Sequence, residues 1–343
     1  MKTLRIYDGA AAACLLILPP LLYAGLGDLT AAYGTAAWLV LLIAAAAALC
    51  LFLITSFLTR GNIKLLDAAA AVCGRPFAVL YGFVLCVYFS YHTGVYARES
   101  AAVLKAYGFN KTPFYVIAGI ILLAALVMNL FGGRAVIKSA GFFFIALLAG
   151  IALVILLGLN RYEPAYLFPV SLNGIDPLEG LYKASFFSGA VLLALFSFGD
   201  GRALRRSGVI SVLTAGGVSA LLCVCYVMMF SRGAGAAMTC GFIEMGQSSY
   251  FNHFFYRFEA PLLLFVIFAA VMQASLGLLI AKESLVSVFK RCSHRGVVCA
   301  AAAAASAAAL VLPDAPVKRY GVFIVAAPPV FLFIISCVKR IFK

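Results

Sequence analysis

The sequence predicts an all-α integral membrane protein with ten transmembrane helices. Of its 343 residues, 65% are hydrophobic, only 11% are charged, and the mean hydropathy is +1.09. A water-soluble domain is near half apolar and about a quarter charged, because its surface must stay hydrated. A bilayer removes that requirement, so residues 1–343 are expected to form a single polytopic membrane domain.

Apolar stretches follow one another along the chain, separated by short connectors that carry charges, Gly or Pro. A helix crosses the hydrocarbon core with about 20 such residues. The ninth stretch is Ala-rich and short, so nine spans are the alternative to ten. The expected spans are residues 9–26, 35–57, 77–103, 113–131, 135–159, 181–198, 208–230, 261–280, 297–312 and 321–338.

The distribution of Lys and Arg predicts the orientation of these spans. With the N-terminus inside, 17 of the 26 basic residues and four of the 12 acidic ones fall on the inner side. Cytoplasmic loops carry the excess of basic residues, so both termini are expected in the cytoplasm. The net charge of +14 then reflects topology and contact with anionic lipid, and no nucleic-acid partner is expected.

The ten cysteines predict neither a disulfide framework nor a metal site. Most lie inside apolar stretches, and Cys240 is the one expected on the outer side. Cys223 and Cys225 are separated by a single residue, which is not the spacing of a zinc site. The sequence also lacks the common catalytic and nucleotide-binding motifs, so no enzyme activity, metal or cofactor is expected.

Charged side chains inside or at the ends of apolar stretches are candidates for function. An ionisable group at membrane depth costs at least about 2.5 kcal/mol and usually faces a cavity or a partner. Arg98 and Glu99 lie late in the third span, and Arg257 and Glu259 lie at the start of the eighth. They either pair with one another or line an outer vestibule.

Helix breakers in the first and sixth spans predict a ligand site between them. Backbone groups freed by a break are tolerated where they line a cavity, and corresponding breaks are expected if two inverted halves of five helices form the bundle. A proline kink and a close-packing glycine are the alternative interpretation. The candidate binding residues, with polar groups of the third and eighth spans, are Leu18, Pro19, Pro20, Tyr96, Phe187, Ser188, Gly189, Gln273 and Ser275.

Short segments spread over most of the chain carry a resemblance to a known family. They include Trp38, the segment from Tyr96 to Ala101, residues 111–113, residues 132–134 with Lys138, residues 168–170, residues 173–177, and residues 257–260 followed by Ser275. In this arrangement the chain resembles the GerAB-type spore germination receptor B subunits of the amino acid–polyamine–organocation transporter superfamily.

This resemblance implies a LeuT-like fold with a five-plus-five inverted repeat, residues 6–159 and 181–338, in which helices 1 and 6 are broken. It also implies a receptor subunit that senses a small amino acid or similar germinant in the inner membrane of an endospore, beside A and C subunits. The alternative is a proton- or cation-coupled amino acid permease. In that case Lys138 is a candidate stand-in for a bound cation, although an anchor at the inner boundary is its other possible role.

Overall fold

In the computed structural model, the described residues form helices joined by turns, and no strand occurs among them. The structure describes residues 5–59, 64–170, 201–248, 259–288, 303–304, 306–307, 324 and 327–336. The α-helices are α1 (Ile6–Ile17), α2 (Leu26–Tyr33), α3 (Ala37–Leu58), α4 (Leu65–Cys73), α5 (Arg75–Tyr107), α6 (Phe114–Leu130), α7 (Gly133–Leu157), α9 (Gly201–Met229), α10 (Arg232–Ala237), α11 (Gly241–Ser248) and α12 (Glu259–Val288). The other elements are a π-helix, η1 (Leu21–Gly25), and three 3₁₀ turns, η2 (Gly34–Ala36), η3 (Leu159–Arg161) and η4 (Pro164–Leu167). A further short apolar helix spans Ala327–Ser336, within the tenth expected span.

Within the described residues, five helical segments are long and apolar enough to cross a membrane. They coincide with the second, third, fifth, seventh and eighth expected spans. Shorter apolar helices, α1 and α6, coincide with the first and fourth. The chain is therefore a multi-pass α-helical membrane protein. The sixth expected span and most of the ninth lie outside the described residues, so the number ten stays a prediction. The five segments are Leu26–Leu58, Arg75–Tyr107, Gly133–Leu157, Arg205–Met229 and Ala260–Val286.

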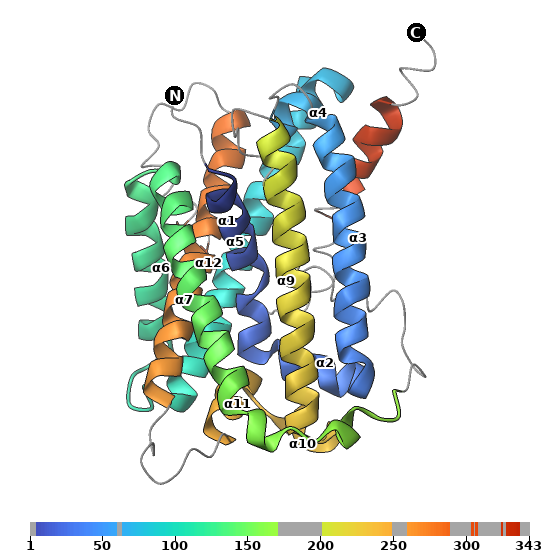
Figure 1. Ribbon diagram of the computed structural model, residues 1–343. Coiled ribbons are helices and arrows are strands. Elements are labelled where there is room, and N and C mark those ends of the chain that lie inside the picture. Colours follow the sequence, from blue (N-terminus) through green and yellow to red (C-terminus); the bar gives the residue numbers. More distant parts are fainter. Residues whose placement is uncertain are drawn as a thin grey trace.

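The long helices run side by side along one direction, with α4 at one end of the bundle and α10 and α11 at the other (Figure 1). We refer to these as the α4 end and the α10 end. α1 starts near the α4 end and packs against α7, α9 and α12. The start of the chain is therefore enclosed by helices from both halves of the sequence.

α5 and α12 form an antiparallel pair in which small residues allow close approach. A Cβ atom on Gly108 would lie 2.7 Å from Cδ1 of Leu263, and one on Gly277 would overlap Oγ1 of Thr93. The first contact lies at one end of the shared interface and the second near the middle of both helices, so the two helices stay close over this length. Small residues serve this purpose in membranes, where association depends on packing rather than on release of water.

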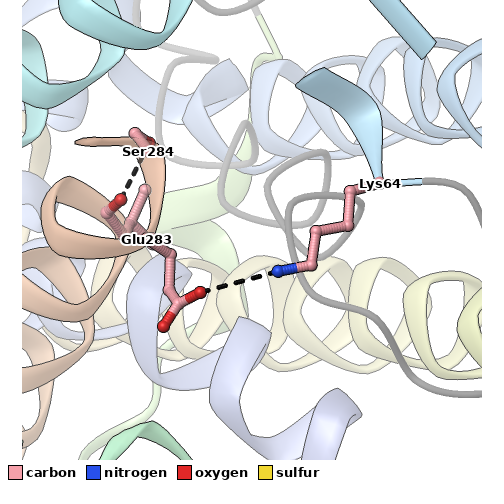
Figure 2. Close-up of polar contacts among 4 residues, drawn as sticks. Lys64, Glu283 and Ser284 are labelled. Carbon is pink, nitrogen blue, oxygen red and sulfur yellow. Dashed lines mark hydrogen bonds and ion pairs between the residues drawn. The ribbon is translucent and has the colours of Figure 1, made fainter. Parts of the chain in front are cut away.

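α4 is a helix where the sequence led us to expect only a connector. Its nine residues extend about 14 Å, too short to cross the membrane, and its buried face includes Leu65 and Leu66. The helix ends at Gly74, whose φ of +92° favours glycine. Directly before α4, Nζ of Lys64 lies 3.7 Å from Oε2 of Glu283 on α12 (Figure 2). The ion pair therefore connects the start of α4 to α12 at this end of the bundle.

Candidate functional site

The first span is interrupted within the bundle, between α1 and α2. α1 ends before Leu18, which forms a bend, and η1 replaces regular α-helix before α2 begins. The carbonyl groups of Leu15 and Leu16 would normally accept hydrogen bonds from residues 19 and 20. Pro19 and Pro20 have no N–H group, so the helix itself cannot supply those donors. The helix is thus irregular at the two prolines, while the backbone stays in the helical region at Leu18 and Pro20, as in a proline kink. All of these residues are buried.

The connection between α10 and α11 holds the irregular segment in place. The Cys240 thiol donates a 3.2 Å hydrogen bond to the carbonyl oxygen of Leu22 in η1. A Cβ atom on Gly27 would lie 2.7 Å from the carbonyl oxygen of Met238, so α2 also touches this connection closely. The side of the membrane on which Cys240 lies stays a prediction, but its side chain is completely buried against the irregular helix. Burial raises the pKa of the Cys240 thiol to about 12.

Tyr23, in η1, has a polar hydroxyl group in the interior of the bundle. Its side chain is completely buried, and its hydroxyl has no hydrogen-bond partner among the described residues. The hydroxyl is near enough to the carboxyl group of Glu99 on α5 for an electrostatic interaction, and Tyr96 interacts with both Glu99 and Tyr23. Buried polar groups without partners are uncommon in proteins, so such a group at a helix break is a candidate ligand contact.

α5 supplies the polar wall opposite η1. Tyr96 is buried, and its ring lies edge-on to His92 with the ring centroids 4.4 Å apart. Arg98 and Glu99 are half-buried one turn further on. The sequence predicted Tyr96 and Glu99 separately, as a ligand contact and as half of a charge pair. The structure brings them into one cluster with Tyr23.

Gln273 on α12 lies at the same depth as this cluster. Because Gly277 meets Thr93, and the helices are antiparallel, Gln273 lies level with Ala97 on α5. Gln273 and Gly277 are four residues apart, so they share one face of α12. The Gln273 side chain is 3% exposed, and neither its Nε2 nor its Oε1 has a hydrogen-bond partner among the described residues. Gln273 is therefore a second buried polar group available to a ligand.

Ser275, two residues further along α12, takes part in contacts between helices. Its hydroxyl donates a 2.6 Å hydrogen bond to the carbonyl oxygen of Val271 and lies 3.4 Å from Sδ of Met128 on α6. Its own carbonyl oxygen accepts a 2.8 Å hydrogen bond from Nδ2 of Asn129. The sequence left open whether Gln273 and Ser275 reach one cavity or bond between helices. In the structure they face different neighbours, and Ser275 faces α6.

The remaining predicted residues are not brought into this cluster by the described part of the chain. Lys138 is on the exposed face of α7. Glu259 opens α12, but the position of its side chain lies outside the described residues, as do the following residues of the predicted site: Phe187, Ser188, Gly189 and Arg257. Among the described residues, no group of three or more His, Cys, Asp or Glu side chains could hold a metal ion.

The cluster matches the chemistry of a small zwitterion. Carbonyl groups at the end of α1 carry partial negative charge, and Glu99 adds a carboxyl group, which together favour an ammonium group. The Tyr23 hydroxyl can donate a hydrogen bond to a carboxylate, and the Gln273 amide can donate and accept. The arrangement is therefore chemically complementary to a small molecule that carries both charges.

Two residues of the site were missed in the sequence, Tyr23 and Cys240. Tyr23 could have been predicted from its position three residues after Pro20, because that spacing places its hydroxyl near backbone carbonyl groups that lack their helical donors. Cys240 had no such signal, because only the folding of its connection back onto η1 buries the thiol. Contact between segments separated by 218 residues in sequence is not readable from either segment alone.

Comparison with known proteins agrees with this membrane architecture. The sequence matches the Spore_permease family, described as "Spore germination protein", over residues 22–316. It is also similar to "Spore germination protein KB" of Bacillus subtilis (strain 168), with 24% identity over 202 residues, which cover 55% of this chain and 53% of that protein. The similarity thus extends over about half the length of the relative. Because the family match covers most of the sequence, this chain belongs to the spore germination protein family.

Proposed function

We propose that this chain is the germinant-sensing membrane subunit of a spore germination receptor, and that it binds a small amino acid or similar nutrient beside the break in the first span. One observation carries the proposal: the Tyr23 hydroxyl and the Gln273 amide are buried at the same depth without hydrogen-bond partners among the described residues. Membership in the spore germination protein family supports the receptor role.

The energetic argument concerns the cost of leaving these groups unpaired. A buried donor or acceptor without a partner costs about 1–3 kcal/mol, and a ligand that supplies the partner recovers that free energy on binding. An amino acid offers a carboxylate to Tyr23 and Gln273 and an ammonium group to the end of α1 and to Glu99. Tyr96 and Leu18 would then border its side chain. The buried surroundings favour a small ligand.

The proposed architecture places this site at the centre of a ten-helix, five-plus-five inverted repeat. The sixth span would complete the site from the opposite repeat through Phe187, Ser188 and Gly189. The charge distribution supports cytoplasmic termini, with the α10 end of the bundle outside the cytoplasm. We further propose that the chain acts with A and C subunits in the inner membrane of the endospore.

The binding experiment uses the full chain in lipid nanodiscs with tritiated L-alanine, L-serine and L-valine as probes. Tyr23→Phe and Gln273→Met are each expected to lower the affinity for the bound probe about tenfold, since each removes one polar contact. Tyr81→Phe is the matched control. Its hydroxyl is also buried without a partner among the described residues, but it lies on α5 about 22 Å from Tyr96. Equal affinity of wild type and Tyr23→Phe would contradict the site.

A second measurement separates sensing from transport. The purified chain is reconstituted into proteoliposomes, and uptake of the same probes is followed with and without an imposed proton gradient. A receptor subunit is expected to bind the probe without accumulating it. Accumulation driven by the gradient, by this chain alone, would show that it is a proton-coupled permease.

A further inference from the structure

A pocket lies at the α10 end of the bundle, away from the irregular part of the first span. Its volume is about 330 Å³, at the lower end of the range of pockets that hold small molecules, about 300–1,000 Å³. It is bordered by the turn between α2 and α3, by η4 with the residues that follow it, and by the start of α10. The side chains that matter here are those of Tyr33, Thr35, Tyr166, Phe168, Ser231 and Arg232.

Main-chain and side-chain hydrogen bonds hold the walls of this pocket together. The hydroxyl of Thr35 donates a 2.9 Å hydrogen bond to the carbonyl oxygen of Pro169, which joins the α2–α3 turn to the segment after η4. The N–H group of Glu163 donates a 2.9 Å hydrogen bond to the carbonyl oxygen of Met228 at the end of α9. The first two walls are thus connected to each other, and the η4 wall is connected to the end of α9.

Arg232 places a cation at the edge of the pocket. Gly34 has a φ of +56°, and a Cβ atom there would lie 2.9 Å from Nε and 3.3 Å from Cζ of Arg232. The guanidinium group therefore lies over a backbone position that only glycine leaves open. Arg232 is exposed, and no acidic side chain of the described residues is within ion-pair distance of it. A planar guanidinium group binds a carboxylate through two parallel hydrogen bonds.

We propose that this pocket binds a small carboxylate-bearing molecule with an apolar or aromatic body. Arg232 binds the carboxylate, Ser231 and Thr35 border it with hydroxyl groups, and the rings of Tyr33, Tyr166 and Phe168 contact the body. This site is distinct from the one at the helix break. Tyr23 and Tyr33 are separated by ten residues of mostly helical chain, which corresponds to about 15 Å.

The test uses 4-fluorobenzoate as the probe, with the full chain in nanodiscs, and follows its binding by ¹⁹F NMR line broadening. Arg232→Gln is expected to weaken binding about ten- to a hundredfold, because it removes a charge-assisted hydrogen bond. Lys111→Gln is the matched control, since it removes one positive charge from an exposed position in the α5–α6 connection at the same end of the bundle. It is expected to leave the affinity unchanged. The neutral analogue 4-fluorobenzamide is expected to bind at least tenfold more weakly than 4-fluorobenzoate.

Additional variants make the outcome decisive. Ala165→Trp fills the pocket from the η4 wall and should abolish binding of 4-fluorobenzoate. This variant tests the pocket independently if Arg232→Gln does not fold. Tyr23→Phe should leave binding of 4-fluorobenzoate unchanged. The proposal is overturned if 4-fluorobenzoate does not bind the wild type, if the Arg232 and Lys111 variants behave alike, or if Ala165→Trp binds as wild type does. Loss of binding in Tyr23→Phe would assign the probe to the helix break instead.

Discussion

The thiol of Cys240 and the carbonyl oxygen of Leu22 are joined by a 3.2 Å hydrogen bond. Through it, the connection between α10 and α11 supports the irregular turn of the first span from which Tyr23 projects. A carbonyl of a π-helical turn thus has its partner in a segment far along the chain. The candidate ligand site depends on this long-range support as well as on the two prolines.

Cys240 is expected to resist alkylation in the folded protein. The thiolate is the reactive form, and with a pKa of about 12 the fraction of thiolate at pH 8 is about a thousandfold lower than for a thiol of pKa 9. Iodoacetamide labelling at pH 8, followed by peptide mass spectrometry, should show modification of Cys240 at least a hundredfold slower in the native chain than in the denatured chain. Comparable rates in the two states would place the thiol at the surface. The rate in the native chain should rise as the pH approaches 12.

Two tyrosine-to-phenylalanine variants should differ in thermal stability. Tyr23→Phe removes a buried hydroxyl that has no hydrogen-bond partner among the described residues, so the free energy of unfolding should stay the same or increase. Tyr226→Phe removes a 2.6 Å hydrogen bond to the carbonyl oxygen of Gly235 and should lower stability by about 0.5–2 kcal/mol. Thermal unfolding in one detergent provides the comparison. A clear loss in Tyr23→Phe would mean that its hydroxyl has a structural partner.

The close packing of α5 and α12 should make Gly277 sensitive to a single methyl group. In Gly277→Ala, the new Cβ would overlap Oγ1 of Thr93, so we expect a loss of about 1–3 kcal/mol in unfolding free energy. Thr93→Ala removes the overlapping atom, and the hydrogen bond lost with it is the one to the carbonyl oxygen of Phe89 on the same helix. The double variant should therefore regain most of the stability. If the two losses simply add, the two residues are not in direct contact.

Two glycines on α9 form a matched pair for a similar test. A Cβ atom on Gly208 would overlap the ring of Phe52 on α3, whereas one on Gly217 has no atom within 4 Å. Gly208→Ala should therefore destabilise the protein by about 1–3 kcal/mol. Gly217→Ala should be neutral or stabilising by up to about 1 kcal/mol, since alanine is the better helix former. Thermal unfolding of both variants in one detergent tests the α3–α9 contact; equal behaviour would contradict it.

Much of the architecture was readable from composition and local pattern. Long apolar runs can be stable in a membrane only as helices, because every backbone group must find its partner within the segment. This is why the described long helices coincide with expected spans. The break at Pro19 and Pro20 was readable for an equally local reason, since proline lacks the N–H group that a regular helix requires. α4 was not predicted because its apolar run is too short to indicate a span. Only its packing against α5 distinguishes it from a connector.

The sequence by itself therefore determined the membrane class, the positions of the described long helices and the break in the first span. Only the tertiary structure decided which polar groups share a site. Gln273 and Ser275 are two residues apart on α12, yet one lies level with the polar cluster and the other faces α6. A helix turns about 200° over two residues, so these two side chains point to nearly opposite faces. The helices packed against each face then determine what each side chain contacts. Cys240 is buried and Lys138 exposed for the same reason, because helix packing sets the surroundings of each.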